Sequence, residues 1–170
     1  GVRYLEEHPH ISLTEKIEEI ANILEKQCKA LNIDIPKIAM EPGRSIVADA
    51  GMTLYTIGSV KEITGYKNYV SVDGGMTDNP RYTLYESPYT VMLASRANAE
   101  KDFCATIAGR CCESGDILQE NVTLPKPRRN EILAVLTTGA YNYSMSSHYN
   151  RLPKPPVVMV SKNNFRTQNR

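Results

Sequence analysis

The sequence has almost no charge imbalance and no long apolar run, and each absence excludes a class of protein. Its 170 residues carry 20 Lys and Arg against 19 Asp and Glu, a formal net charge of +1. Such a balance gives no basic surface for nucleic acid or an anionic membrane, so neither is expected as a partner. No stretch approaches the roughly 18 apolar residues of a membrane span, and residues 1–7 lack a secretory leader pattern. We therefore expect a soluble, cytoplasmic protein.

Spacings that hold metals or form disulfides are also missing. The four cysteines are Cys28, Cys104, Cys111 and Cys112. No two of them stand in a Cys-x-x-Cys pair, and adjacent cysteines rarely bridge each other, so neither a disulfide framework nor a zinc site is expected. The three histidines, at positions 8, 10 and 148, show no metal-binding spacing. We predict no metal site.

The first part of the chain predicts one β/α unit. Ser12 and Glu15 form a capping box, and apolar residues then recur at three- and four-residue steps over 13–31, which predicts an amphipathic helix. Its apolar stripe is expected to cover a sheet. Residues 37–40 form a short apolar run typical of a buried parallel strand, and 45–51 fit a brief helix.

From residue 53 onward the sequence becomes β-like. Runs rich in β-branched residues and tyrosine, separated by turn clusters, lie at 53–63, 69–72, 89–94, 102–108, 131–136 and 157–160. We predict an antiparallel β-domain over 51–160, a domain boundary near residue 50, and a polar, frayed tail over 161–170. No internal repeat or low-complexity stretch is present.

The most informative motif is the turn at 109–116, Gly-Arg-Cys-Cys-Glu-Ser-Gly-Asp. A cysteine can act as nucleophile or proton donor, and a neighbouring carboxylate can hold a cationic group of a substrate. The glycines allow the backbone to turn sharply. Two adjacent cysteines cannot share one role, and a buried structural thiol is the usual fate of a free cysteine.

Other motifs precede and follow this turn. Glu-Pro-Gly-Arg at 41–44 follows the predicted strand, and its arginine offers a forked pair of donors to an anion. Arg81 and Tyr85, four residues apart, can aim at one place. Tyr141 follows Gly-Ala at a strand exit, and Asp-Gly-Gly at 73–75 is best read as a bend. Taken singly, the motif at 41–44 is also typical of a plain turn. Arg81 and Tyr85 could equally be surface residues, and Tyr141 a core residue.

In this order the motifs resemble those of the diaminopimelate decarboxylases, which are fold-type III pyridoxal-phosphate enzymes. The resemblance runs from about residue 1 to residue 160. It implies the last β/α units of an alanine-racemase-like (β/α)8 barrel over 1–50, followed by an antiparallel Greek-key β-barrel or sandwich. It also implies that a glycine-rich phosphate loop, the lysine that binds the cofactor covalently and a stacking histidine precede residue 1. We therefore expect an inactive fragment that does not hold the cofactor by itself.

The resemblance also assigns roles to individual residues. It implies that the cofactor is bound by Glu41, Gly43, Arg44 and Tyr141. It implies that the substrate is bound by Arg44, Arg81, Tyr85, Glu113 and Tyr141. Cys112 matches the cysteine that gives a proton to the carbanion left by decarboxylation. This sequence departs from the family pattern at Tyr82, where proline is usual.

The expected function is decarboxylation of meso-2,6-diaminopimelate to L-lysine, the last step of lysine biosynthesis, with pyridoxal phosphate. The resemblance implies a homodimer with sites at the interface, where the neighbouring subunit contributes the Cys-Glu motif. One alternative is a decarboxylase of the same fold that acts on ornithine, arginine or carboxynorspermidine. Those for ornithine and arginine typically carry aspartate at the position of Glu113, so glutamate favours diaminopimelate. The other alternative is a non-catalytic β-domain that dimerises.

Overall fold

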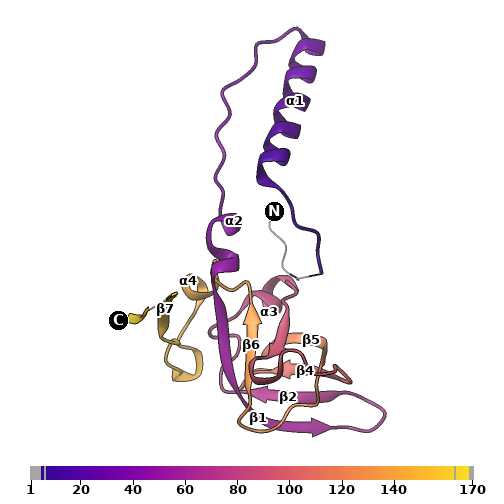
Figure 1. Ribbon diagram of the computed structural model, residues 1–170, viewed down its shortest axis with the longest axis vertical. Coiled ribbons are helices and arrows are strands. Elements are labelled where there is room, and N and C mark those ends of the chain that lie inside the picture. Colours follow the sequence, from indigo (N-terminus) through magenta and orange to yellow (C-terminus); the bar gives the residue numbers. More distant parts are fainter. Residues whose placement is uncertain (1–4, 6, 163, 169–170) are drawn as a thin grey trace.

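The computed structural model describes residues 5, 7–162 and 164–168 (Figure 1). The initial segment 1–4 that contributes to the resemblance lies outside the described residues. The helices are α1 (Leu13–Leu31), α2 (Arg44–Val47), α3 (Arg81–Tyr85) and α4 (Asn142–Met145), with 3-10 turns η1 (Ala48–Ala50), η2 (Ala94–Arg96) and η3 (Tyr149–Arg151). The strands are β1 (Met52–Glu62), β2 (Asn68–Val72), β3 (Val91–Leu93), β4 (Phe103–Ala108), β5 (Ile117–Leu124), β6 (Ile132–Leu136), β7 (Val157–Ser161) and β8 (Asn164–Gln168).

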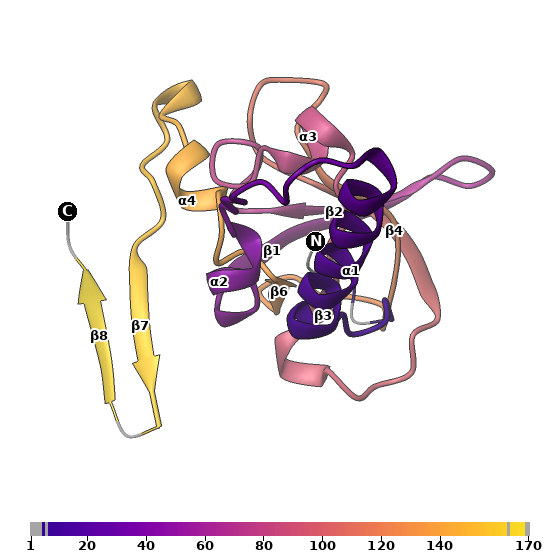
Figure 2. The same cartoon turned by 90° about the horizontal axis from the view of Figure 1, so that it is seen from above.

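Helix α1 has the predicted bounds and the predicted start. The Ser12 hydroxyl accepts a hydrogen bond from the Glu15 amide at 3.3 Å, and the helix ends at Asn32, which adopts a left-handed φ of 53°. Its apolar stripe, however, covers no sheet within the described residues. Ile17 is 50% exposed and Leu31 67% exposed, because α1 stands away from the sheet (Figure 1). Seen from above, the helix overlaps the sheet in projection (Figure 2).

The strand predicted at 37–40 does not form. This segment is extended but unpaired, and Ile38 and Met40 are exposed. A strand is stabilised by hydrogen bonds to a neighbouring strand, and none of the described strands lies beside this segment. The brief helix predicted over 45–51 is present as α2 and η1.

The described residues after 51 form a six-stranded sheet in the order β3-β6-β1-β2-β4-β5, together with the β7-β8 hairpin. The prediction of an antiparallel domain is wrong in one pairing, because β2 and β4 run parallel, with Tyr69 opposite Thr106. The long connection over 73–102 carries the chain back to the same end of the sheet, which allows this pairing. The edge strands β3 and β5 also contact each other, so the mixed sheet is nearly closed.

Most predicted strands agree with the structure to within two residues. Strand β5 was missed because its polar centre, Gln119-Glu120-Asn121, interrupts the apolar pattern, and Asn121 takes a left-handed φ of 54° in this irregular edge strand. The tail predicted to be frayed instead contributes β8, whose backbone pairs with β7.

The core lies inside the nearly closed sheet. Alternate residues of β1, such as Tyr55 and Ile57, point into it, and the fully buried aliphatic side chains are Ile57, Val70, Leu93, Ile107, Leu118, Leu124, Leu133 and Val135. Burial of each such side chain stabilises the fold by about 1.5–3 kcal/mol. This core fixes where the strands end, and therefore where the loops emerge.

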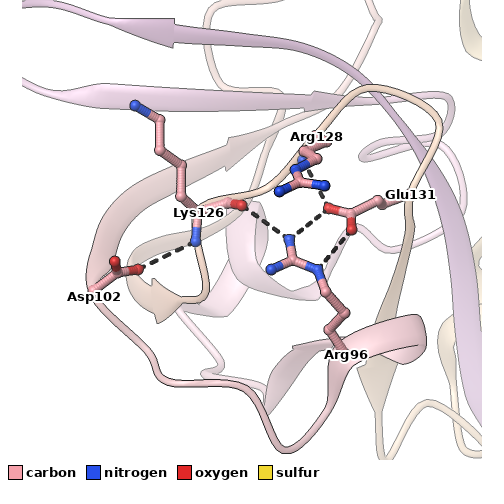
Figure 3. A network of polar contacts seen from close by, with 5 residues as sticks. All are labelled: Arg96, Asp102, Lys126, Arg128 and Glu131. Atoms are coloured by element: carbon pink, nitrogen blue, oxygen red, sulfur yellow. Dashed lines mark hydrogen bonds and ion pairs between the residues drawn. The ribbon is translucent and has the colours of Figure 1, made fainter.

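One end of the sheet is closed by an ionic network (Figure 3). Arg96 of η2 donates to Glu131 through Nε at 2.7 Å and Nη2 at 2.8 Å, and Nη2 also donates to the Lys126 carbonyl at 2.9 Å. The Arg128 amide donates to Glu131 at 2.7 Å. These contacts tie η2 to the β5–β6 connection and leave the other end of the sheet to the motif loops.

Candidate functional site

All the motif segments meet at one end of the sheet. Strands β2, β4 and β6 run in one direction and antiparallel to β1, with Leu136 opposite Met52 and Ser71 opposite Ala108. The segments that follow these strands, 73–90, 109–116 and 137–151, therefore emerge where the segment 41–51 enters β1 (Figure 1). The sheet thus brings four distant stretches of sequence together.

The turn after β4 exposes the two residues with the strongest predicted roles. Cys112 and Glu113 are both exposed. The Cys112 amide donates to Asn150 Oδ1 at 2.7 Å, and the Glu113 carboxylate accepts from the Ser114 hydroxyl at 3.4 Å. Asn150, which adopts a left-handed φ of 51°, belongs to the segment after β6, so that segment supports the turn. A thiol and a carboxylate are thereby presented side by side.

Two arginines flank the ring of Tyr141. The guanidinium carbon of Arg81 lies 5.1 Å from the ring centroid, and that of Arg44 lies 6.0 Å from it. Tyr141 precedes α4 with a positive φ of 70°, which is rare for a residue other than glycine. The Tyr141 hydroxyl packs so tightly on Gly43 that a Cβ there would overlap it. These residues form a cationic and phenolic cluster.

Tyr85 joins this cluster, whereas Glu41 does not. Arg81 lies over the Tyr85 ring at 5.0 Å, so the four-residue spacing does place these side chains together on α3. Tyr85 is 58% exposed and remains open to a ligand. Glu41 is exposed in the unpaired segment before α2.

Helix α3 is also tied to the thiol turn. The Thr83 hydroxyl donates to the Gly115 carbonyl at 2.9 Å. Because Arg81 and Tyr85 lie on the same short helix, this bond connects the arginine cluster with the turn that carries Cys112 and Glu113. The structure therefore brings the two groups to the same end of one sheet.

Buried polar residues that the sequence did not indicate support these loops. Asp78 accepts hydrogen bonds from the Tyr55 hydroxyl at 2.5 Å and from the Gly75 amide at 3.0 Å. Burial raises the pKa of Asp78, and burial followed by the charge of Asp78 raises the pKa of Tyr55. The bend predicted at 73–75 is confirmed, since the backbone bends at Asp73. A Cβ on Gly74 would overlap the Tyr55 ring, so the loop packs closely there.

A second buried pair joins the segments that carry Arg81 and Tyr141. Asn142 Nδ2 donates to Asn79 Oδ1 at 2.7 Å, and both residues are almost fully buried. The Tyr89 hydroxyl donates to Asn142 Oδ1 at 3.3 Å. The burial of Asn79 and Asn142 could not be predicted from the neighbouring residues, because it depends on contacts with residues far away in sequence.

Comparison with known proteins identifies the family. The profile of the pyridoxal-dependent decarboxylase C-terminal sheet domain matches residues 14–139. The chain belongs to this family. The resemblance suggested by the order of the motifs is thus confirmed, and the match agrees with a C-terminal sheet domain, although its sheet is mixed rather than antiparallel.

Individual relatives agree with this assignment of the sheet domain. A diaminopimelate decarboxylase of Bacillus methanolicus is 49% identical over 160 residues, which are 94% of this chain and 37% of the relative. The chain therefore spans little more than a third of that relative. The crystal structure of diaminopimelate decarboxylase from M. jannaschii in co-complex with L-lysine matches with a TM-score of 0.82 and 29% identity, covering 96% of this chain and 37% of that one. The corresponding Helicobacter pylori enzyme, also complexed with L-lysine, gives 0.79 and 30%, covering 98% and 39%.

Across residues 5, 7–162 and 164–168, no three His, Cys, Asp or Glu side chains gather in a way that could hold a metal ion. In the same ranges, no helix has both the length and the apolar character needed to cross a membrane.

Proposed function

We propose that the protein containing this sheet domain decarboxylates meso-2,6-diaminopimelate to L-lysine with pyridoxal phosphate. The observation that carries the proposal is the grouping of Arg44, Arg81 and Tyr141 at the end of the sheet that also presents Cys112 and Glu113. Relatives of this chain bear the name diaminopimelate decarboxylase, and two related crystal structures hold L-lysine. The substrate is thus a small amino acid with charged groups at both ends.

The residues present fit the phosphate of the cofactor. The Arg44 guanidinium and the Tyr141 hydroxyl are donors of the kind that bind phosphate oxygens, and Gly43 lets the backbone approach closely. Glu41 would complete the cofactor-binding set. When bound, pyridoxal phosphate supplies an electron sink for the electron pair that remains when carbon dioxide leaves.

The remaining residues would bind and protonate the substrate. Arg81, Tyr85 and Arg44 offer cationic and phenolic donors to the carboxylate at the end that does not react. The Glu113 carboxylate would pair with the distal ammonium, and Tyr141 would close over the bound molecule. The Cys112 thiol would give its Sγ proton to the α-carbon.

We further infer the arrangement of the whole protein. Residues 1–50 would belong to the last β/α units of a barrel that supplies the other half of the cofactor site, and residues 51–160 would form a Greek-key β-domain. The exposed apolar stripe of α1 suits such a partner. The protein would be a cytoplasmic homodimer. Each site would lie at the interface, and Cys112 and Glu113 of one copy would act in the site of the other copy.

The test is turnover by the full-length protein with pyridoxal phosphate. Meso-2,6-diaminopimelate should be decarboxylated in preference to ornithine, arginine and carboxynorspermidine. Glu113→Gln should raise KM for diaminopimelate by about 10–100-fold, because a charge-assisted hydrogen bond is lost. Glu120→Gln is the matched control. It alters a carboxylate of β5 that pairs with Lys67, and it should leave KM unchanged.

Cys112→Ala should lower kcat, whereas Cys104→Ala on β4 should not. Preference for ornithine, arginine or carboxynorspermidine would reassign the substrate within the same chemistry. No turnover of any of these amino acids would instead favour a non-catalytic sheet domain that only dimerises.

A further inference from the structure

Asp116 stands where two loops of the candidate site meet. It is 3% exposed, and its carboxylate accepts a hydrogen bond from the Met76 amide at 2.6 Å and another from the Cys111 amide at 2.6 Å. Met76 belongs to the loop after β2, whereas Cys111 belongs to the turn after β4. A single buried carboxylate therefore joins these loops.

The backbone around Asp116 also closes the turn on itself. The Gly109 amide donates to the Asp116 carbonyl at 2.8 Å, and the Asp116 amide donates to the Glu113 carbonyl at 3.1 Å. A Cβ added at Gly75 or at Gly109 would overlap the Asp116 carboxylate. Both glycines are thus required for close approach, and the space they leave is filled by this side chain.

The two adjacent thiols consequently have different surroundings. Cys111 is only partly exposed, and burial, followed by the Asp116 carboxylate, raises the pKa of its thiol, while Thr77 lowers that pKa in part. Cys112 is exposed, and its amide is held from the other side by Asn150. One thiol is therefore partly enclosed beside Asp116, and the next is exposed.

We propose that Asp116 is a positioning residue that fixes the Cys111–Cys112 turn, so that the thiol of Cys112 rather than that of Cys111 is presented outward at this end of the sheet. This inference rests on the proposed function only for the reaction that Cys112 performs. The arrangement of the thiols can be measured without any turnover.

The test is site-resolved alkylation of the full-length protein and its Asp116→Asn variant with iodoacetamide at pH 8. Asparagine keeps the shape of aspartate, but its NH2 group would face one of the two backbone N–H groups that donate to the carboxylate, so one hydrogen bond is lost. Peptide mass spectrometry gives the rate at each cysteine. In the unsubstituted protein Cys112 should react several-fold faster than Cys111, because Cys112 is exposed and Cys111 is partly enclosed. Asp116→Asn should raise the Cys111-to-Cys112 rate ratio several-fold, because the carboxylate that disfavours the Cys111 thiolate is removed.

Controls separate this effect from unfolding. Asp102→Asn, at the opposite end of the sheet, removes part of a carboxylate that accepts from the Lys126 amide at 3.3 Å and should leave the ratio unchanged. Exposed Cys104 provides a reference rate. Near-ultraviolet circular dichroism reports whether the sheet domain keeps its packing.

An unchanged ratio in Asp116→Asn, with the circular dichroism spectrum of the unsubstituted protein retained, would overturn the proposal. If the variant loses that spectrum, the alkylation rates of the unsubstituted protein decide. Equal rates at Cys111 and Cys112 there would contradict the inference, and slower reaction at Cys111 would support it.

Kinetics add a second readout. Asp116→Asn should lower kcat for decarboxylation by about tenfold or more, because a small displacement of a reacting group is costly. It should leave the apparent affinity for pyridoxal phosphate unchanged, since Gly43, Arg44 and Tyr141 are untouched. An unsubstituted protein without decarboxylase activity would remove the proposed function, while the alkylation ratio would still test Asp116.

Discussion

At the scale of single residues, the candidate site is shaped by buried polar groups as much as by the exposed motif residues. Asp78, Asn79, Asp116 and Asn142 are each less than 10% exposed and hydrogen-bonded to a loop other than their own or to a strand. Burial without such partners would cost several kcal/mol, so each bond constrains the loop that supplies it. These residues determine how the motif side chains are presented.

The first prediction concerns Asp78. Asp78→Ala should lower the free energy of unfolding by about 2 kcal/mol or more, because Tyr55, Gly75 and Thr77 all lose their acceptor. Asp78→Asn should stay within about 1 kcal/mol of the unsubstituted chain at pH 7, since its oxygen can still accept and its amide can donate to the Tyr55 oxygen. Urea unfolding of both variants measures this difference.

The pH dependence has a definite sign. Because burial raises the folded-state pKa of Asp78 above its unfolded value, the carboxyl group stabilises the fold most at low pH. That contribution is lost as the pH rises from the unfolded-state pKa of Asp78 through its raised folded-state pKa. Asp78→Asn lacks this titration, so its stability relative to the unsubstituted chain should increase over that window; a constant difference would contradict the assignment.

The second prediction concerns the amide pair that joins the Arg81 and Tyr141 segments. Asn142→Ala should lower the free energy of unfolding by about 1–3 kcal/mol, because it leaves the buried Asn79 carbonyl without its donor. Asn68→Ala, which removes an exposed bond to the Cys104 carbonyl, should cost less. Thermal unfolding of the two variants compares them, and equal losses would argue against a special role for the buried pair.

At the scale of elements, each end of the sheet is organised by a different kind of contact. The motif end relies on buried hydrogen bonds between loops, whereas the opposite end relies on the forked ion pair between Arg96 and Glu131 (Figure 3). Hydrogen bonding to Arg96 is the main cause that lowers the pKa of Glu131. This pair attaches η2 to the β5–β6 connection, and thereby fixes the end of β3 next to the beginning of β6.

The third prediction follows from that lowered pKa. The Glu131 carboxylate stabilises the fold at pH values above its unfolded-state pKa of about 4.3. This stabilisation should be lost as the pH falls through the lower pKa of the folded state. Glu131→Gln should therefore lower the unfolding temperature at pH 7 and remove part of the acid sensitivity. Glu19→Gln, in the exposed pair with Lys16 on α1, is the control and should change neither quantity. Matching acid titrations of Glu131→Gln and the unsubstituted chain would rule out this role.

At the scale of the whole molecule, the sheet and α1 differ in how they are stabilised. The sheet has its own core, whereas α1 buries only Cys28 and exposes most of its apolar stripe. The chain also spans 37% of a curated relative, and an exposed apolar stripe of this size is typical of an interaction surface.

The fourth prediction tests this division of stability. Ile17→Ser should change the free energy of unfolding of this chain by less than about 0.5 kcal/mol, because Ile17 is exposed. Leu133→Ala, in the centre of β6, should cost about 2–5 kcal/mol. In the full-length protein Ile17→Ser should become more costly than in this chain. Equal small effects in both would mean that the stripe stays uncovered.

The sequence by itself determined the local features and the family. Helix α1 followed from the Ser12 cap and the spacing of its apolar residues, most strands of the sheet followed from β-branched runs, and the ordered motifs indicated a pyridoxal-dependent decarboxylase. Each of these signals lies within a few neighbouring residues, so the amino-acid pattern alone is sufficient to reveal it.

Only the tertiary structure decided which segments pair and which polar groups are buried. The parallel pairing of β2 with β4, the unpaired state of 37–40 and the enclosure of Asp116 between two loops all depend on residues far away in sequence. Strand pairing needs a partner's hydrogen-bonding groups, and burial needs atoms from other elements. Neither requirement is written into the segment itself.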